Sequence, residues 1–145
     1  MKQLKLGWCT NVSDESLPHL SSMNRLQEID LALTSISDVV PLHERLSEFS
    51  CLDISGSKVK KESVRKLFSL FREEKSLEKL EDLRLRFTSD LSTDVLKILA
   101  RRAPSLKVLD ISYCDLDLKH KSVQELLRTF KRNGTHVLCG QSTTE

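Results

Sequence analysis

Short apolar–polar–apolar triplets recur along the chain with the alternation expected of a half-buried strand. The clearest copies are 29–31 (Ile-Asp-Leu), 52–54 (Leu-Asp-Ile) and 109–111 (Leu-Asp-Ile). Each has an apolar residue three positions before it, and another follows five positions after its last residue. A spacing repeated in this way predicts an array of similar structural units.

The same frame extends to six predicted strands at intervals of 25, 23, 31, 26 and 28 residues. The third interval is long, and we expect residues 72–81 to absorb the excess as a longer helix end or an outward loop. The paired apolar positions of the six strands are Leu4/Leu6, Ile29/Leu31, Leu52/Ile54, Leu83/Leu85, Leu109/Ile111 and Val137/Cys139.

The segments between strands carry apolar residues at helical spacing, which predicts helices over 64–71, 95–103 and 123–130. Ser92 is a predicted N-cap, and Gly134 follows the last helix at a position that favours left-handed backbone. The second repeat contains Pro41 and few apolar residues, so it has room for only about two helical turns.

Parallel strands that alternate with helices packing back on them predict a right-handed solenoid. The expected fold is therefore α/β, with about six parallel strands on a concave sheet and helices on the convex side. We expect residues 1–140 to form this single domain and residues 141–145 a polar tail. Because the first strand begins near residue 4 with nothing to cover its flank, an N-terminal cap or domain is expected to be missing.

Residues 4–14 read L-K-L-G-W-C-T-N-V-S-D, which resembles the cysteine-containing type of leucine-rich repeat. The fifth repeat carries the equivalent cysteine, Cys114, with one residue fewer before its next apolar position. This repeat type is familiar from the F-box/leucine-rich-repeat and Zyg/Zer-like substrate receptors of cullin ubiquitin ligases. No F-box or adaptor-binding helix is recognisable, so the resemblance implies the substrate-facing part of such a receptor, with its adaptor bound through a missing segment.

The composition narrows the class of protein. The chain has 145 residues, 39% apolar and 30% charged, and a formal net charge of only +2. We therefore expect a monomer that binds neither nucleic acid nor membrane, and we interpret the basic stretches at 58–66 and 119–132 as solvated helix faces. No apolar run is long enough to span a membrane, and four widely spaced cysteines favour reduced thiols in the cytoplasm or nucleus.

The cysteines and histidines do not form a pattern that suggests catalysis or metal binding. Cys9 and Cys114 occupy the turn after their strands, where a small thiol is expected to point inward and bond the backbone. The four histidines show no H-x-x-x-H spacing, and no glycine-rich phosphate loop is present. We predict no enzyme activity, no metal and no cofactor.

The concave face supplies the candidate site. Side chains between the core positions form a charged row, a track of mostly small residues follows, and the next column contains the chain's one Trp and one Tyr together with a Phe. Aromatic and arginine side chains with a charged rim are typical of protein interfaces. Alternatively, the aromatic rings fold inward over the sheet end, and Asp30 and Asp53 simply contact neighbours such as Lys5 and Arg84. The predicted partner-binding residues are Trp8, Asp30, Asp53, Arg84, Arg86, Phe87, Asp110 and Tyr113.

The prediction for function is a non-catalytic module that binds a protein or peptide on its concave face. The family resemblance implies substrate selection for a cullin ubiquitin ligase. The alternative is a scaffold or regulator of another class, such as a GTPase regulator, a nuclear adaptor or an assembly factor.

Overall fold

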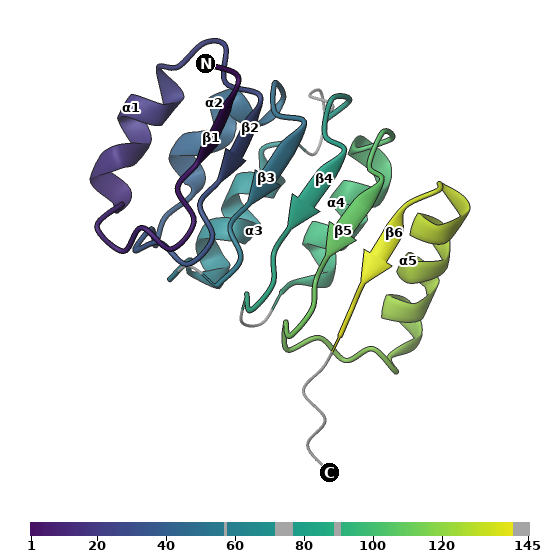
Figure 1. Cartoon of the computed structure of the whole chain (residues 1–145). Coiled ribbons are helices and arrows are strands. Elements are labelled where there is room, and N and C mark those ends of the chain that lie inside the picture. Colours follow the sequence, from purple (N-terminus) through teal and green to yellow (C-terminus); the bar gives the residue numbers. More distant parts are fainter. Residues whose placement is uncertain (57, 72–76, 89–90, 141–145) are drawn as a thin grey trace.

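Six strands form one parallel sheet in the order of the sequence, as predicted. The computed structural model describes residues 1–56, 58–71, 77–88 and 91–140. In Figure 1 the helices cover one face of the sheet and leave the other open. The strands are β1 (Gln3–Lys5), β2 (Glu28–Asp30), β3 (Cys51–Asp53), β4 (Asp82–Arg84), β5 (Val108–Asp110) and β6 (His136–Leu138).

Each of the first five strands is followed by a helical segment that returns the chain to the next strand. The three C-terminal helices lie where the apolar periodicity predicts them, and the second repeat has only two short helical segments. The helices are η1 (Asp14–Ser16), α1 (Leu17–Ser21), η2 (Val40–Leu42), α2 (His43–Leu46), α3 (Lys61–Ser69), α4 (Thr93–Arg102) and α5 (Lys121–Arg132).

The apolar residues in the middle of the strands lie in register, from Leu4 through Ile29, Leu52, Leu83 and Leu109 to Val137. Those in β2 to β5 are buried together with the apolar faces of the helices in a single core. At about 25 cal/mol per Å² of buried apolar surface, this continuous core is the main stabilising term of the fold. The predicted register is confirmed, and the result is a leucine-rich-repeat-like sheet.

Two predicted helix boundaries are also confirmed. The Ser92 hydroxyl accepts a hydrogen bond from the backbone N–H of Asp94, so it caps α4. Gly134 has φ +84° just after α5, where a residue without Cβ adopts left-handed backbone without steric cost. Part of the predicted 72–81 loop, residues 72–76, lies outside the described residues, as does the 141–145 tail.

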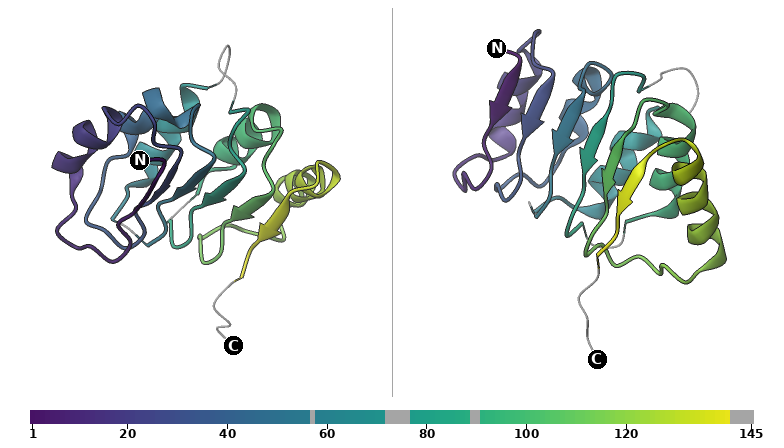
Figure 2. Two further views of the ribbon diagram at one scale, coloured as in Figure 1. Left: turned by 45° about the horizontal axis from the view of Figure 1, so that its top comes forward. Right: turned by 45° about the vertical axis from the view of Figure 1, so that its right-hand side comes forward.

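The α-helices differ in length along the solenoid, from four residues in α2 to twelve in α5. Figure 2 shows these helices along the outer side of the array and the strands on its inner side. Within the described residues, no helix is long and apolar enough to cross a membrane.

The position after each turn gives a mixed result for the inward-pointing prediction. Thr34, Thr88 and Cys114 are buried there, and Cys114 Sγ donates to the Leu85 carbonyl oxygen at 2.9 Å. Cys9 is exposed, so the prediction is wrong for the first repeat. The reason is geometric: Leu85 belongs to the repeat preceding that of Cys114, whereas β1 is the first strand of the sheet and has a neighbour on one side only.

Candidate functional site

The turn that follows each of the first five strands adopts left-handed backbone at the same position. The φ angles are +67° at Trp8, +58° at Leu33, +64° at Gly56, +61° at Phe87 and +59° at Tyr113. Each of these residues donates its backbone N–H to a carbonyl of the next repeat, over 2.8 to 3.1 Å. The turns therefore continue the sheet's hydrogen-bond ladder and hold five equivalent positions in one row.

Large apolar side chains stand on this row at the surface. The exposed fraction is 79% for Trp8, 53% for Phe87 and 43% for Tyr113. The rings of Phe87 and Tyr113 stack with centroids 4.8 Å apart and planes at 7°. The half-buried side chain of Leu33 leans over Gly56, where an added Cβ would approach Leu33 Cδ2 to 2.5 Å. We call Trp8, Leu33, Phe87 and Tyr113 the apolar ridge.

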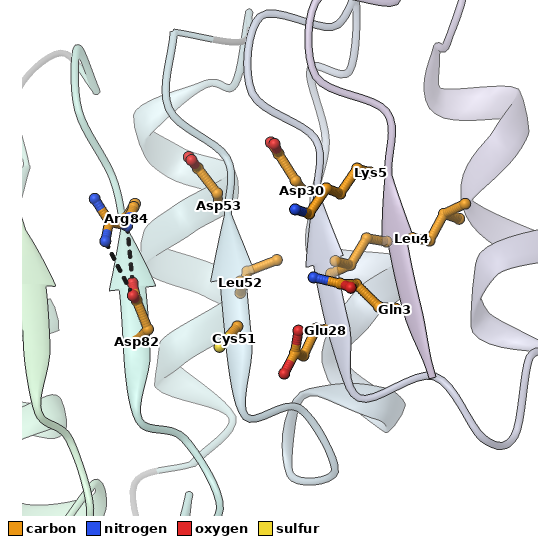
Figure 3. Close-up of a pocket in the computed structure, with 11 residues that line it drawn as sticks. Gln3, Leu4, Lys5, Glu28, Asp30, Cys51, Leu52, Asp53, Asp82 and Arg84 are labelled. Atoms are coloured by element: carbon orange, nitrogen blue, oxygen red, sulfur yellow. Dashed lines mark hydrogen bonds and ion pairs between the residues drawn. The ribbon is translucent and has the colours of Figure 1, made fainter. Parts of the chain in front are cut away.

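The aspartates of the strands have a local role that was not predicted from the sequence. Asp30, Asp53 and Asp110 each accept a hydrogen bond through Oδ1 from the backbone N–H two residues ahead, at 2.9, 2.9 and 3.1 Å. In Figure 3 the carboxyl groups of Asp30 and Asp53 both point toward the end of their strand. One oxygen of each carboxylate thus stabilises the turn, while the negative charge of the carboxylate stays on the concave side of the sheet.

Arg84 and Arg86 extend over the fourth and fifth strands and are held by acidic neighbours. Arg84 makes a bidentate pair with Asp82, with both N–O distances at 3.0 Å, and this hydrogen bonding raises the pKa of its guanidinium. Asp110 Oδ2 lies 3.5 Å from Arg86 Nε and 4.0 Å from Arg84 Nη1. With its side chain only 3% exposed, Asp110 lies beneath the arginines and positions them, rather than offering a free surface to a partner.

A shallow groove of about 300 Å³ runs across β1 to β4 on the open face of the sheet. Figure 3 shows its lining side chains, including Lys5, Asp30, Asp53 and Arg84 of the predicted charged row. A second row, which was not predicted from the sequence, lines the groove as well. Strand alternation could have found this row, because residues two positions apart face the same side of a strand. Its members are Gln3, Glu28, Cys51 and Asp82.

The groove is acidic toward its β1–β3 end. Four carboxylates and two basic side chains line it, so its formal charge is −2. Asp82 is paired with Arg84, which leaves Lys5 facing Glu28, Asp30 and Asp53. Burial, followed by the charge of Glu28, raises the pKa of the Cys51 thiol, so this cysteine remains protonated at neutral pH.

The predicted site residues thus separate into two neighbouring features. Trp8, Phe87 and Tyr113 share the ridge, while Asp30, Asp53 and Arg84 line the groove. Asp110 in β5 continues the charged row beyond the groove and pairs with Arg86, which follows β4. Among the described residues, no group of three or more His, Cys, Asp or Glu side chains is placed to hold a metal ion.

A scan against protein-family models finds no match to the chain, and a search of curated protein sequences finds none either. The protein is therefore classified by its fold alone, as a repeated parallel β-α arrangement of six strands.

Proposed function

We propose that this protein is a non-catalytic interaction module that binds a protein or peptide partner on its concave face, with the apolar ridge as the main contact. The observation that carries the proposal is the row of large apolar side chains on left-handed backbone, of which Trp8, Phe87 and Tyr113 are exposed.

The arrangement of bulky, exposed side chains on left-handed backbone does not favour the folded state. Left-handed backbone costs a residue with a Cβ roughly 1–2 kcal/mol. An aromatic side chain that stays exposed contributes little hydrophobic stabilisation to offset this cost. Gly56 makes the same turn in the third repeat without that cost. Four bulky side chains at such a position favour a role in contact with another molecule, because strained positions cluster at functional sites.

The composition of the face supports a protein partner. Trp, Tyr and Arg are the side chains that most often dominate the energetics of protein interfaces, and Trp8, Tyr113 and Arg86 all lie here. The stacked rings of Phe87 and Tyr113 form a preorganised apolar surface, which lowers the entropy cost of binding. The protonated thiol of Cys51 and the paired charges of Arg84 and Asp82 favour recognition over chemistry.

The finer identity of the module rests on the sequence resemblance. The cysteine-containing repeat pattern of residues 4–14 favours the substrate-recognition part of a cullin ubiquitin ligase. A scaffold or regulator of another class would use the same face. Affinity purification followed by mass spectrometry separates them: cullin, elongin or Skp-type adaptors support the ligase, and a GTPase or an assembly complex supports the alternative.

The direct test removes the three aromatic side chains of the ridge without disturbing the fold. In the triple variant Trp8→Asn, Phe87→Ala and Tyr113→Ala, we expect partner capture to fall at least tenfold, since interface aromatics contribute about 2 kcal/mol or more each. Asn tolerates left-handed backbone, so Trp8→Asn alone should leave the free energy of unfolding unchanged or raise it by up to about 1 kcal/mol.

The matched control is Leu70→Ala, which removes an exposed apolar side chain from the end of α3. We expect this variant to capture partners at the wild-type level. Equal capture by the wild type and the ridge variant would contradict the proposal.

A further inference from the structure

We infer that the segment recognised on this face is a basic one: an extended peptide whose Lys or Arg side chains enter the groove over β1–β3 while its apolar side chains rest on the ridge. This inference rests on the proposed function and specifies the chemistry of the partner.

The β1–β3 end of the groove carries three carboxylates and one lysine, and the charge of Arg84, which is paired with Asp82, reaches only Asp53 among them. In the described part of the chain, no ion pair joins Lys5 to the carboxylates of Glu28, Asp30 or Asp53, although all four line the same groove. The charges beside them are matched, Arg84 by Asp82 and Arg86 by Asp110. The excess negative charge at the β1–β3 end would therefore attract a cationic side chain of a partner. An anionic side chain would be repelled, because it would meet three carboxylates and one lysine.

Groove and ridge lie close enough for one extended peptide to contact both. Leu33 follows Asp30 by three residues, and at about 3.3 Å per residue the two features lie about 10 Å apart. Gly7 lies between them, and its missing side chain leaves room for the Asp30 carboxylate, whose Oδ2 would lie 3.0 Å from a Cβ at that position. Because alternate side chains of an extended peptide point to opposite sides, one set reaches the groove and the other the ridge.

The molecule as a whole does not attract a cation. Its formal net charge is +2, and the convex helices carry basic surface residues such as Arg65, Lys97 and Lys131. If the protein prefers a basic peptide, the cause would therefore be the local negative charge of the concave face, because the overall positive charge of the molecule acts against such binding.

The test uses three synthetic nine-residue peptides in which Phe alternates with Arg, Ser or Glu, titrated into the ¹⁵N-labelled 145-residue chain at low ionic strength. We expect the Arg peptide to bind about tenfold more tightly than the Ser peptide and the Glu peptide to bind most weakly. Rising salt should reduce the preference for Arg, because exposed charges are screened. Amide shifts are expected in β1–β3 and at the turn residues of the ridge.

The decisive variant is Asp30→Asn with Asp53→Asn. The amide oxygen of Asn can still accept the backbone hydrogen bond two residues ahead, so the turns are kept and only the charge is lost. We expect this variant to bind the Arg peptide about three- to tenfold more weakly and the Ser peptide unchanged, since an exposed charge contributes up to about fivefold. The control Glu62→Gln with Glu125→Gln makes the same change in net charge on α3 and α5, and it should keep the wild-type affinity.

The outcomes separate the inference from the function on which it rests. Equal binding of the Arg and Ser peptides, a preference for Glu, or an equal effect of the control variant would overturn the basic partner while leaving ridge binding intact. If no peptide binds and none shifts the amides of the ridge, the proposed function fails and the inference with it.

Discussion

The first and fifth repeats carry similar side chains at several positions but place them in different surroundings. Trp8 corresponds to Tyr113 and Cys9 to Cys114, and both aromatic residues have the same left-handed backbone. In the fifth repeat the cysteine is buried against the preceding repeat, and the tyrosine stacks on Phe87. In the first repeat the cysteine is exposed and Trp8 is the most exposed of the ridge side chains.

The difference shows that a position in the repeat frame determines the direction of a side chain, whereas its neighbours in the array determine its burial. A unit of a solenoid buries its flanks only against the units beside it. Leu109 in β5 has a strand on each side and is fully buried, but Leu4 in the edge strand β1 is half-buried. Measurements on matched residues of the two repeats test this explanation.

The largest expected difference is in the core. Leu109→Ala should lower the free energy of unfolding by about 3 kcal/mol, because it opens a cavity in a closely packed interior. Leu4→Ala, in the matched position of the first repeat, should cost about 1 kcal/mol, since its side chain already contacts water. Urea denaturation followed by circular dichroism measures both. Equal losses would mean that the two ends of the solenoid are equally well covered.

The next difference concerns the two cysteines. Cys114→Ala should cost about 1–2 kcal/mol through the lost packing and the lost hydrogen bond to Leu85, whereas Cys9→Ala should change stability by less than about 0.5 kcal/mol. Alkylation of the native protein, read by mass spectrometry, should modify Cys9 well before Cys114. Similar labelling rates would contradict the buried position of Cys114.

The buried thiol of Cys114 should also make the stability of the fold depend on pH. Burial raises the pKa of Cys114 to about 11, against an ordinary value of 9.0. The protonated thiol therefore stabilises the native state below pH 9, and this stabilisation is lost as the pH rises toward 11, because the unfolded chain ionises first. The Cys114→Ala variant should show a smaller loss of stability over that interval.

The smallest effect is expected from Asp14, whose place in the fifth repeat is taken by Leu118. Burial opposes ionisation of Asp14, but hydrogen bonds from the Ser37 hydroxyl and from the backbone N–H groups of Ser37 and Asp38 outweigh it and lower the pKa of the carboxyl below 3.8. This stabilisation is present above that pH and is lost as the pH falls through the lowered pKa.

Acid titration of the wild type and of Asp14→Asn tests this contribution. The wild type should lose slightly more stability below about pH 4 than the variant, while the two curves run parallel above that pH. Parallel curves over the whole range would show that the contacts between Asp14 and Ser37 do not stabilise the native state.

Much of the fold could be predicted because a repeated β-α unit imposes its period on the sequence. The apolar strand positions, from Ile29 in β2 to Val137 in β6, follow from apolar alternation alone, and so do the helix faces. The Ser92 cap follows from its place just before a helical run. The candidate site was predictable only in part. The ridge column emerged from the frame, but the exposure of Trp8 and Phe87 depends on backbone angles that composition does not encode.

The six strands, their register and the side chains that share the open face all follow from period and alternation, which are properties of the amino-acid sequence. What those side chains do depends on the tertiary structure. It turned the aspartate oxygens onto the turns, placed Asp110 beneath two arginines, stacked Phe87 on Tyr113 and left Cys9 uncovered. These outcomes depend on which residues of neighbouring repeats meet in space, and that is settled by packing rather than by local pattern.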